Sequence, residues 1–222
     1  MKHSGDIPLH SEIVRKAIHL LSLSIPLGYI FVPQQIALTI LIPLMIAFVA
    51  VDVLMHVSPP VRQLFLRCFG FLLRPHELET RHLFLNGASY VMISACLCIL
   101  LFPKVIAVTA FAILILADIA SALVGKTVGQ RQFLDKSAEG SVAFLLTSWI
   151  VVAVLGSFFQ APWSYFIAGC CGGIAGTVAE AGSIRLHMDD NLSIPLSIGT
   201  VMWALGWVAE QWWNTPFLHL LS

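Results

Sequence analysis

Long runs of apolar residues, separated by short polar stretches, repeat along the whole chain. A helix needs about 20 residues to cross about 30 Å of hydrocarbon, and seven runs approach or reach that length. They cover residues 18–32, 36–57, 83–102, 105–124, 142–159, 163–178 and 192–213. The first and the sixth are short, so six or eight crossings are alternatives. The pattern predicts an all-α polytopic membrane bundle of about seven transmembrane helices, built as a single domain over residues 1–222.

A second pattern marks residues 59–74, where polar and apolar side chains recur at helical spacing. Gln63, Arg67, Gly70 and Arg74 fall on one face of a helix, and the opposite face is apolar. Such a segment is typical of an amphipathic helix that lies in the membrane interface. The charged loop that follows is by default solvated, although Glu77 is also compatible with a position facing a site.

The composition supports membrane insertion. Of the 222 residues 58% are hydrophobic, and the mean hydropathy is +0.89, which exceeds what a soluble domain of this size carries. A formal net charge of zero argues against a nucleic-acid partner. Four of the five cysteines lie in apolar runs without metal-ligand spacing, so we expect free thiols. No small-residue cleavage pattern follows the first run, which predicts a retained helix and not a signal peptide.

The distribution of charge predicts an orientation. With seven crossings, eleven of the twelve basic residues share a side with the N-terminus, and only Lys104 lies opposite; the eleven are Lys2, Arg15, Lys16, Arg62, Arg67, Arg74, Arg81, Lys126, Arg131, Lys136 and Arg185. The positive-inside rule therefore predicts a cytoplasmic N-terminus and a C-terminus on the other side. The acidic residues, Glu210 excepted, fall on the same side or near the ends of helices on that side. A transporter needs polar groups open to both faces, so this asymmetry favours chemistry at the cytosolic surface.

Residues 118–141 carry the clearest candidate chemistry. Asp118 lies inside an apolar run, where a charge is costly enough to indicate a functional site, and it shares a helical face with Ser121, Ala122 and Gly125. The loop beyond contains Gly125, Lys126, Gly129, Arg131, Lys136, Ser137, Glu139 and Gly140. Glycine backbone with Lys and Ser suits a phosphate group. The alternative is an ordinary turn, and the stretch matches neither the dinucleotide nor the Walker pattern. We interpret it as a nucleotide loop.

A polar stripe enters the first apolar run. Glu12, Arg15, Lys16 and His19 recur at helical spacing. An Arg-Lys pair at such a position is also an ordinary topological anchor. The added Glu and His favour a site wall, in which Arg15 and Lys16 would hold phosphate oxygens.

Further carboxylates follow the sixth apolar run, at Glu180, Asp189 and Asp190, before Asn191. Carboxylates that converge from separate loops are the usual way to hold Mg²⁺ against phosphates. Asp189 and Asp190 alone are equally compatible with a helix cap. Convergence with Asp118 is what would make a metal site.

Taken together, these segments resemble the polyprenol kinase family, which includes dolichol, phytol and farnesol kinases and CTP-dependent diacylglycerol kinases. The matching pieces run in order along nearly the whole chain. They are the entry stripe at 12–19, RPHE at 74–77, NGASY at 86–90, DxASALVGKxxG at 118–129, KSxEGS at 136–141, and Glu180 with DNLSIP at 190–195. The central block is also similar to one in phosphatidate cytidylyltransferases. The family more often has Gly-Asp-Pro or Gly-Asp-Thr where this chain has Ala117, Asp118 and Ile119, which bears on the local turn geometry.

The resemblance implies a membrane enzyme that transfers the terminal phosphoryl group of a nucleotide, commonly CTP, to a lipid alcohol with Mg²⁺. Arg15, Lys16, Asp118 and Gly125 match the essential motif positions. We expect catalytic roles for Asp118, Lys136, Glu139, Arg15 and Lys16, with either Asp118 or Glu139 as the base. The expected metal ligands are Asp118, Glu180 and Asp190. The expected nucleotide contacts are Arg15, Lys16, His19, Ser121, Gly125, Lys126, Gly129, Lys136, Ser137 and Asn191. The rivals are a cytidylyltransferase that makes a CDP-lipid and a transporter or scaffold.

Overall fold

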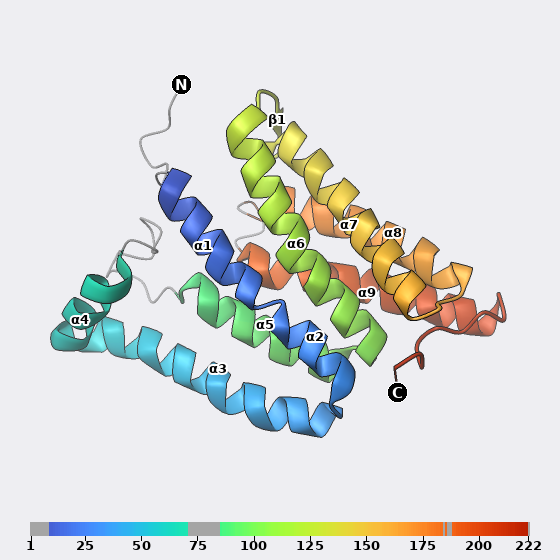
Figure 1. The fold of residues 1–222 in the computed structure, drawn as a ribbon, viewed down its shortest axis with the longest axis horizontal. Coiled ribbons are helices and arrows are strands. Elements are labelled where there is room, and N and C mark those ends of the chain that lie inside the picture. Colours follow the sequence, from blue (N-terminus) through green and yellow to red (C-terminus); the bar gives the residue numbers. More distant parts are fainter. Residues whose placement is uncertain (1–8, 71–84, 184, 186–187, 222) are drawn as a thin grey trace.

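A computed structural model describes residues 9–70, 85–183, 185 and 188–221, with side chains from residue 14 onward (Figure 1). Within these ranges the chain forms helices joined by short loops, and its two strands make one small hairpin. The helices are α1 (Leu9–Leu21), α2 (Ser24–Phe31), α3 (Gln34–Val57), α4 (Pro59–Phe69), α5 (Gly87–Leu101), α6 (Lys104–Val128), α7 (Ala138–Phe158), α8 (Trp163–Ala181) and α9 (Asp190–Gln211). The strands are β1 (Gln132–Phe133) and β2 (Lys136–Ser137). The predicted all-α class is confirmed.

Four helices, α3, α6, α7 and α9, are long and apolar enough to cross a membrane, and α5 is a shorter apolar helix. The membrane character is thus supported, whereas seven crossings remain a prediction. The amphipathic helix predicted over 59–74 begins at Pro59, where proline suits the first turn, and α4 ends at Phe69. Residues 71–74 and the RPHE motif lie outside the described residues.

The first apolar run is not one helix, as the sequence pattern predicted, but two. α1 ends at Leu21 and α2 begins at Ser24. Pro26 explains the break, because its ring lacks an N–H and clashes with the carbonyl four residues earlier, which belongs to Ser22. The carbonyl of Ser22 instead accepts the N–H of Ile25 at 3.0 Å. The break lets α1 and α2 take separate paths along α6.

α6 is the central helix of the bundle. In its most apolar window 78% of the residues are buried, against 17% for α3, so α6 forms the core and most of α3 is left for lipid. A helix that is apolar all round is expected in such a buried position. Figure 1 shows α6 between the α1–α2 pair and α7. A polar group on α6 is therefore surrounded by protein.

Small residues let α8 pack closely between its neighbours. A Cβ on Gly169 would lie 2.6 Å from Val152 of α7, and one on Gly176 would lie 2.8 Å from Ile198 of α9. Close approach of this kind is typical of membrane helices. The five cysteines, all within the described residues, are free, as expected.

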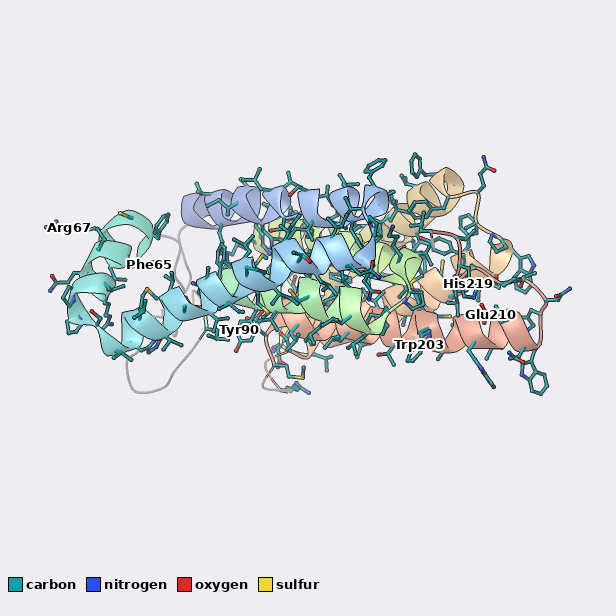
Figure 2. The ribbon with its side chains drawn as sticks, turned by 90° about the horizontal axis from the view of Figure 1, so that it is seen from below. Phe65, Arg67, Tyr90, Trp203, Glu210 and His219 are labelled. Atoms are coloured by element: carbon teal, nitrogen blue, oxygen red, sulfur yellow. The ribbon has the colours of Figure 1, made fainter. Side chains whose placement is uncertain are left out.

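The two ends of the bundle differ in character. α4, with Phe65 and Arg67, lies at one end, and Trp203, Glu210 and His219 lie toward the other (Figure 2). At this second end the rings of Trp163 and Trp213 stack with centroids 5.1 Å apart. Tryptophan is enriched where membrane meets water, so an interface at this end agrees with a crossing bundle.

Candidate active site

A buried ion pair joins the first helix to the central one. The ammonium of Lys16 on α1 donates a hydrogen bond to Oδ2 of Asp118 on α6, although the two residues are 102 positions apart. Asp118 is 6% and Lys16 7% exposed. Nε2 of His19, one turn after Lys16, lies 3.6 Å from the same carboxylate oxygen. Asp118 therefore faces the protein interior and not the acyl chains.

Asp118 lies ten residues before Val128, the last residue of α6, or about 15 Å from that end at 1.5 Å per residue. The apolar run predicted an end at Val124, so the helix continues for an extra turn and Asp118 is deeper than expected. Lys126, predicted to contact the nucleotide, lies exposed in this last turn. Arg15, the neighbour of Lys16, is half-buried.

A second group of charges centres on Lys136 of β2. Its Nζ lies 2.8 Å from Oε1 of Glu180 on α8 and 3.3 Å from Oδ2 of Asp190 on α9. The hydroxyl of Ser121 on α6 donates to the same Glu180 oxygen at 3.0 Å. Burial acts to lower the pKa of Lys136, but the carboxylates of Asp190, Glu180 and Asp118 outweigh it and raise this pKa above its ordinary value. Lys136 is therefore a cation at any physiological pH.

The two groups meet along one face of α6, because Ser121 follows Asp118 by about one helical turn. We call them together the charged cluster, defined as Lys16, His19, Asp118, Ser121, Lys136, Glu180 and Asp190. Its members come from α1, α6, β2, α8 and α9. The structure thus brings together the three carboxylates predicted as metal ligands and two of the cations predicted to hold phosphates.

The hairpin that carries Lys136 is held in place by local chemistry. β1 pairs antiparallel with β2, so that Phe133 lies opposite Lys136, and Leu134 makes the turn with a positive φ of 54°. Ser137 then caps α7, because its Oγ accepts the N–H of Gly140 at 3.1 Å. The short hairpin and the capped helix that follows it fix the position of the Lys136 backbone.

The glycines of the loop have a packing role that the sequence did not show. A Cβ on Gly129 would lie 2.2 Å from the carbonyl oxygen of Gly125, and a Cβ on Gly125 would lie 2.8 Å from Oγ of Ser137. A Cβ on Gly140 would meet both Ser137 and Ser121. The sequence pattern attributed these glycines to close approach of a phosphate. In the structure the space beside them is filled by the chain's own Ser137 and Ser121.

Glu139, the other predicted base, supports this loop. Its carboxylate accepts the backbone N–H of Gln130 at 3.1 Å and that of Arg131 at 3.3 Å. Its described hydrogen bonds are thus to the loop between α6 and α7 and not to the charged cluster.

Asp189 and Asp190, adjacent in sequence, have different roles. Asp189 caps α9, since its Oδ1 accepts the backbone N–H of Asn191 at 2.9 Å and the side-chain amide of Asn191 at 2.7 Å. Asp190 faces Lys136 instead. The sequence left helix cap and site as alternatives for this pair. In the structure Asp189 is the cap and Asp190 belongs to the site.

Asp52 on α3 was not predicted as a site residue. It is fully buried, and its carboxylate accepts the backbone N–H of Asn86 at 2.9 Å, the hydroxyl of Ser89 at 2.6 Å and the side-chain amide of Asn86. A Cβ on the next residue, Gly87, would lie 3.6 Å from the amide nitrogen of Asn191. A carboxylate in an apolar run was the available signal, the same one that identified Asp118.

The fit of a divalent cation can be judged from these oxygens. Within the described residues no group of three or more His, Cys, Asp or Glu side chains is arranged to hold a metal. The donors are nevertheless all oxygen, which is the chemistry that Mg²⁺ prefers, and Oε2 of Glu180 is buried without a hydrogen-bond partner. These oxygens are thus of the type that a hard cation takes, while in this conformation Lys136 lies between two of the carboxylates.

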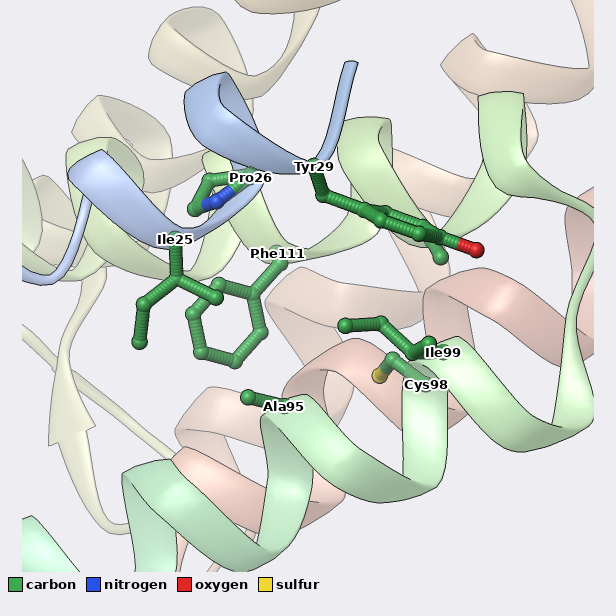
Figure 3. Close-up of a pocket in the computed structure, with 8 residues that line it drawn as sticks. Ile25, Pro26, Tyr29, Ala95, Cys98, Ile99 and Phe111 are labelled. Atoms are coloured by element: carbon green, nitrogen blue, oxygen red, sulfur yellow. The ribbon is translucent and has the colours of Figure 1, made fainter. Parts of the chain in front are cut away.

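An apolar pocket lies farther along the same helix. It is enclosed by α2, α5 and α6, and Figure 3 shows Tyr29, Cys98 and Phe111 among the side chains that line it. Phe111 precedes Asp118 by about two helical turns and so falls on nearly the same face of α6. The pocket thus lies in line with the charged cluster, deeper in the bundle.

Comparison with known proteins finds a relative of this chain. The chain is 32% identical over 187 residues to the uncharacterized protein RP860 of Rickettsia prowazekii (strain Madrid E), and the match covers 84% of this chain and 90% of the relative. The chain therefore belongs to the same family as this Rickettsia protein. No family model matches the chain, and no solved structure does.

Proposed function

We propose that the protein is a membrane lipid-alcohol kinase. It transfers the terminal phosphoryl group of a nucleoside triphosphate, with CTP favoured, to an isoprenoid alcohol or diacylglycerol. The observation that carries this proposal is the charged cluster itself. Five ionisable side chains, from Lys16, Asp118, Lys136, Glu180 and Asp190, converge from distant parts of a largely apolar chain. Charges at such depth are costly and mark functional sites in membrane proteins.

The cations of the cluster suit the donor. Phosphoryl transfer depends mostly on positioning and on neutralising charge, and ammonium groups form strong hydrogen bonds with phosphate oxygens. Lys136 is the best placed, because 31% of its side chain is exposed, whereas Lys16 is held in the interior by Asp118. We assign Lys136 to the nucleotide's phosphates, with Arg15 and Lys16 behind it.

In the transfer itself, the lipid hydroxyl oxygen forms a bond to the terminal phosphorus. The bond from that phosphorus to the bridging oxygen breaks, and the nucleoside diphosphate leaves. The hydroxyl proton needs an acceptor, and we assign Asp118, since Glu139 is bonded to the loop backbone. With Asp118 as the base, a Mg²⁺ ion held by Glu180 and Asp190 would neutralise the charge of the phosphates. The products are a lipid phosphate and a nucleoside diphosphate.

The acceptor enters from the bilayer in this proposal. The charged cluster would lie beneath the cytosolic headgroups of a seven-crossing bundle, with the C-terminus on the other side. An alcohol on an apolar body places its hydroxyl at Asp118 and leaves its tail among the apolar helices. Polyprenol, phytol, farnesol and diacylglycerol share this chemistry.

The test is a product analysis with purified protein in detergent micelles. CTP labelled on the γ-phosphate, with Mg²⁺, is supplied to a panel of lipid alcohols, and a parallel reaction uses α-labelled CTP with phosphatidate. The proposal predicts label in a lipid phosphate from the γ position only. Asp118→Asn should lose this activity, whereas Asp135→Asn, which alters a carboxylate paired with the exposed side chain of Arg185, should keep it. A CDP-lipid product would establish the cytidylyltransferase instead, and the absence of any turnover would favour a transporter.

A further inference from the structure

The place of Lys136 between two carboxylates carries a further inference, which rests on the proposed function for the identity of the nucleotide. We propose that in the nucleotide-free protein Lys136 occupies the position of a divalent cation between Glu180 and Asp190. The ammonium must then leave these carboxylates before the metal–nucleotide complex can bind. Lys136 would thus couple metal binding to nucleotide binding.

The first observation is the geometry of the ammonium. Nζ of Lys136 lies 2.8 Å from Oε1 of Glu180 and 3.3 Å from Oδ2 of Asp190, so one positive group bridges carboxylates from two different helices. Glu180 is 1% exposed, and removal of the bridging charge would leave its carboxylate buried with one neutral hydrogen bond, from Ser121. A buried carboxylate in that state strongly favours a replacement cation.

The second observation is an unused oxygen. Both described partners of Glu180, Lys136 and Ser121, contact Oε1, whereas Oε2 is buried and has no hydrogen-bond partner. Buried polar atoms in folded proteins are nearly always satisfied. A carboxylate oxygen accepts only, so the missing partner is a donor or a cation. An ammonium bridge therefore uses only part of what this site offers, and a metal that takes more oxygens would use the rest.

The third observation is that the side chain of Lys136 is partly open to solvent and can therefore move off the carboxylates. Its side chain is 31% exposed, against 8% for the side chain of Lys16. A lysine is a compact charge on a flexible stem, and phosphate oxygens replace the carboxylates as partners of similar strength. The exchange moves Lys136 onto the nucleotide and places the doubly charged ion on the carboxylates. Neither the ammonium nor the carboxylates lose their partners in the exchange.

This arrangement predicts how metal and nucleotide depend on each other. Without nucleotide, a metal ion must displace Lys136 into water and binds weakly. With nucleotide, the phosphates receive the ammonium and the metal binds tightly. Two ligands that each favour the same rearranged state bind with positive, reciprocal coupling.

Binding of Mn²⁺, measured by electron paramagnetic resonance on purified protein without lipid alcohol, tests the inference. Lys136→Met should bind Mn²⁺ tighter than the wild type by about tenfold or more without nucleotide, because a cation within about 4 Å of the site has been removed. Lys104→Met is the matched control, since it removes a lysine at the far end of α6 and should leave Mn²⁺ affinity unchanged. Adding Glu180→Gln to Lys136→Met should abolish the gain.

The outcomes separate this inference from the proposed function. If Lys136→Met binds Mn²⁺ no better than the wild type while the wild type phosphorylates a lipid alcohol, the inference is wrong and the kinase stands. If the gain in Mn²⁺ affinity appears and is lost with Glu180→Gln, the inference holds even where no transfer is found. Lys136→Arg keeps the charge and should bind Mn²⁺ as weakly as the wild type; tighter binding in this variant would show that the charge does not exclude the metal.

Discussion

The ion pair between Lys16 and Asp118 makes a quantitative prediction about stability. Both side chains are buried, and Lys16 is the nearest cation to the Asp118 carboxylate within the part of the chain that the structure describes. Lys16→Met removes the ammonium while keeping a stem of similar length. Asp118 is then left as a buried carboxylate near His19, whose ring contributes a positive charge only if protonated. We expect the variant to be markedly less stable than the wild type.

The magnitude follows from the burial. Two unit charges about 4 Å apart attract by about 4 kcal/mol at an effective dielectric constant of about 20, and breaking a buried pair by removing one partner typically costs about 3–5 kcal/mol. Asp118→Asn should cost a similar amount, since it leaves Lys16 buried with a neutral amide. In the double variant neither charge remains. The double variant should therefore be more stable than the sum of the two single losses predicts, by about 2 kcal/mol or more.

Unfolding by SDS in mixed micelles, followed by the fluorescence of the six tryptophans, measures these differences. Arg185→Met serves as the control, because it breaks a pair with Asp135 in which the arginine side chain is 64% exposed, and pairs open to water contribute about 0–1 kcal/mol. Single losses below about 1 kcal/mol that simply add in the double variant would refute a buried pair between α1 and α6. The same double variant also separates stability from catalysis, since it should recover folding but not phosphoryl transfer.

Three further predictions concern the loop, the phosphate contacts and the pocket. Gly129→Ala should destabilise the protein by about 1–3 kcal/mol through overpacking, because its Cβ would overlap the Gly125 carbonyl. Gly28→Ala in α2 is the control, since its Cβ meets open space and should stabilise the protein by up to about 1 kcal/mol. Equal effects of the two variants in the same SDS titration would contradict this packing. Lys136→Ala should raise the KM for nucleotide by about tenfold or more and leave the KM for the lipid alcohol nearly unchanged, so an unaltered nucleotide KM would remove Lys136 from phosphate binding. Ala107→Leu adds three carbons beside a cavity of about 10 Å³ and should destabilise the protein by about 1–3 kcal/mol through overpacking. No loss in the same SDS titration would show that the helices around this pocket are loosely packed.

The helices themselves were predictable because hydrophobic length and helical period are local properties of the sequence. α3, α6 and α9 lie where the apolar runs placed them, and α6 differs mainly by continuing to Val128. Pro26 could have predicted the break between α1 and α2. It was overlooked because the apolar run continues on both sides of it. Whether a given helix crosses a membrane depends on its surroundings as well as on its composition, and for that reason the number of crossings does not follow from these runs alone.

The members of the charged cluster were predictable one at a time, but their pairing was not. A carboxylate inside an apolar run is conspicuous, and that identified Asp118. Nothing local indicates that its partner is Lys16 on another helix, or that Lys136 bridges Glu180 and Asp190. Such pairs form because each buried charge must find an opposite charge in the folded bundle, which is a property of the tertiary structure. The glycines of the loop show the same limit of sequence analysis. The sequence tells that a Cβ is absent at these positions, but not which atom occupies the space beside them.

Asp52 shows why an unexplained buried charge needs its partners before its role can be assigned. It has the same signal as Asp118, a carboxylate in an apolar helix, yet its three described donors belong to Asn86 and Ser89, at the start of α5. Because these hydrogen bonds are to neutral groups of one helix terminus, Asp52 fixes the position of that terminus. Gly87 in turn lies beside Asn191, the residue after Asp190. The described donors around Asp52 thus tie the start of α5 to α3, whereas the described hydrogen bond of Asp118 comes from the ammonium of Lys16 and ties α6 to α1.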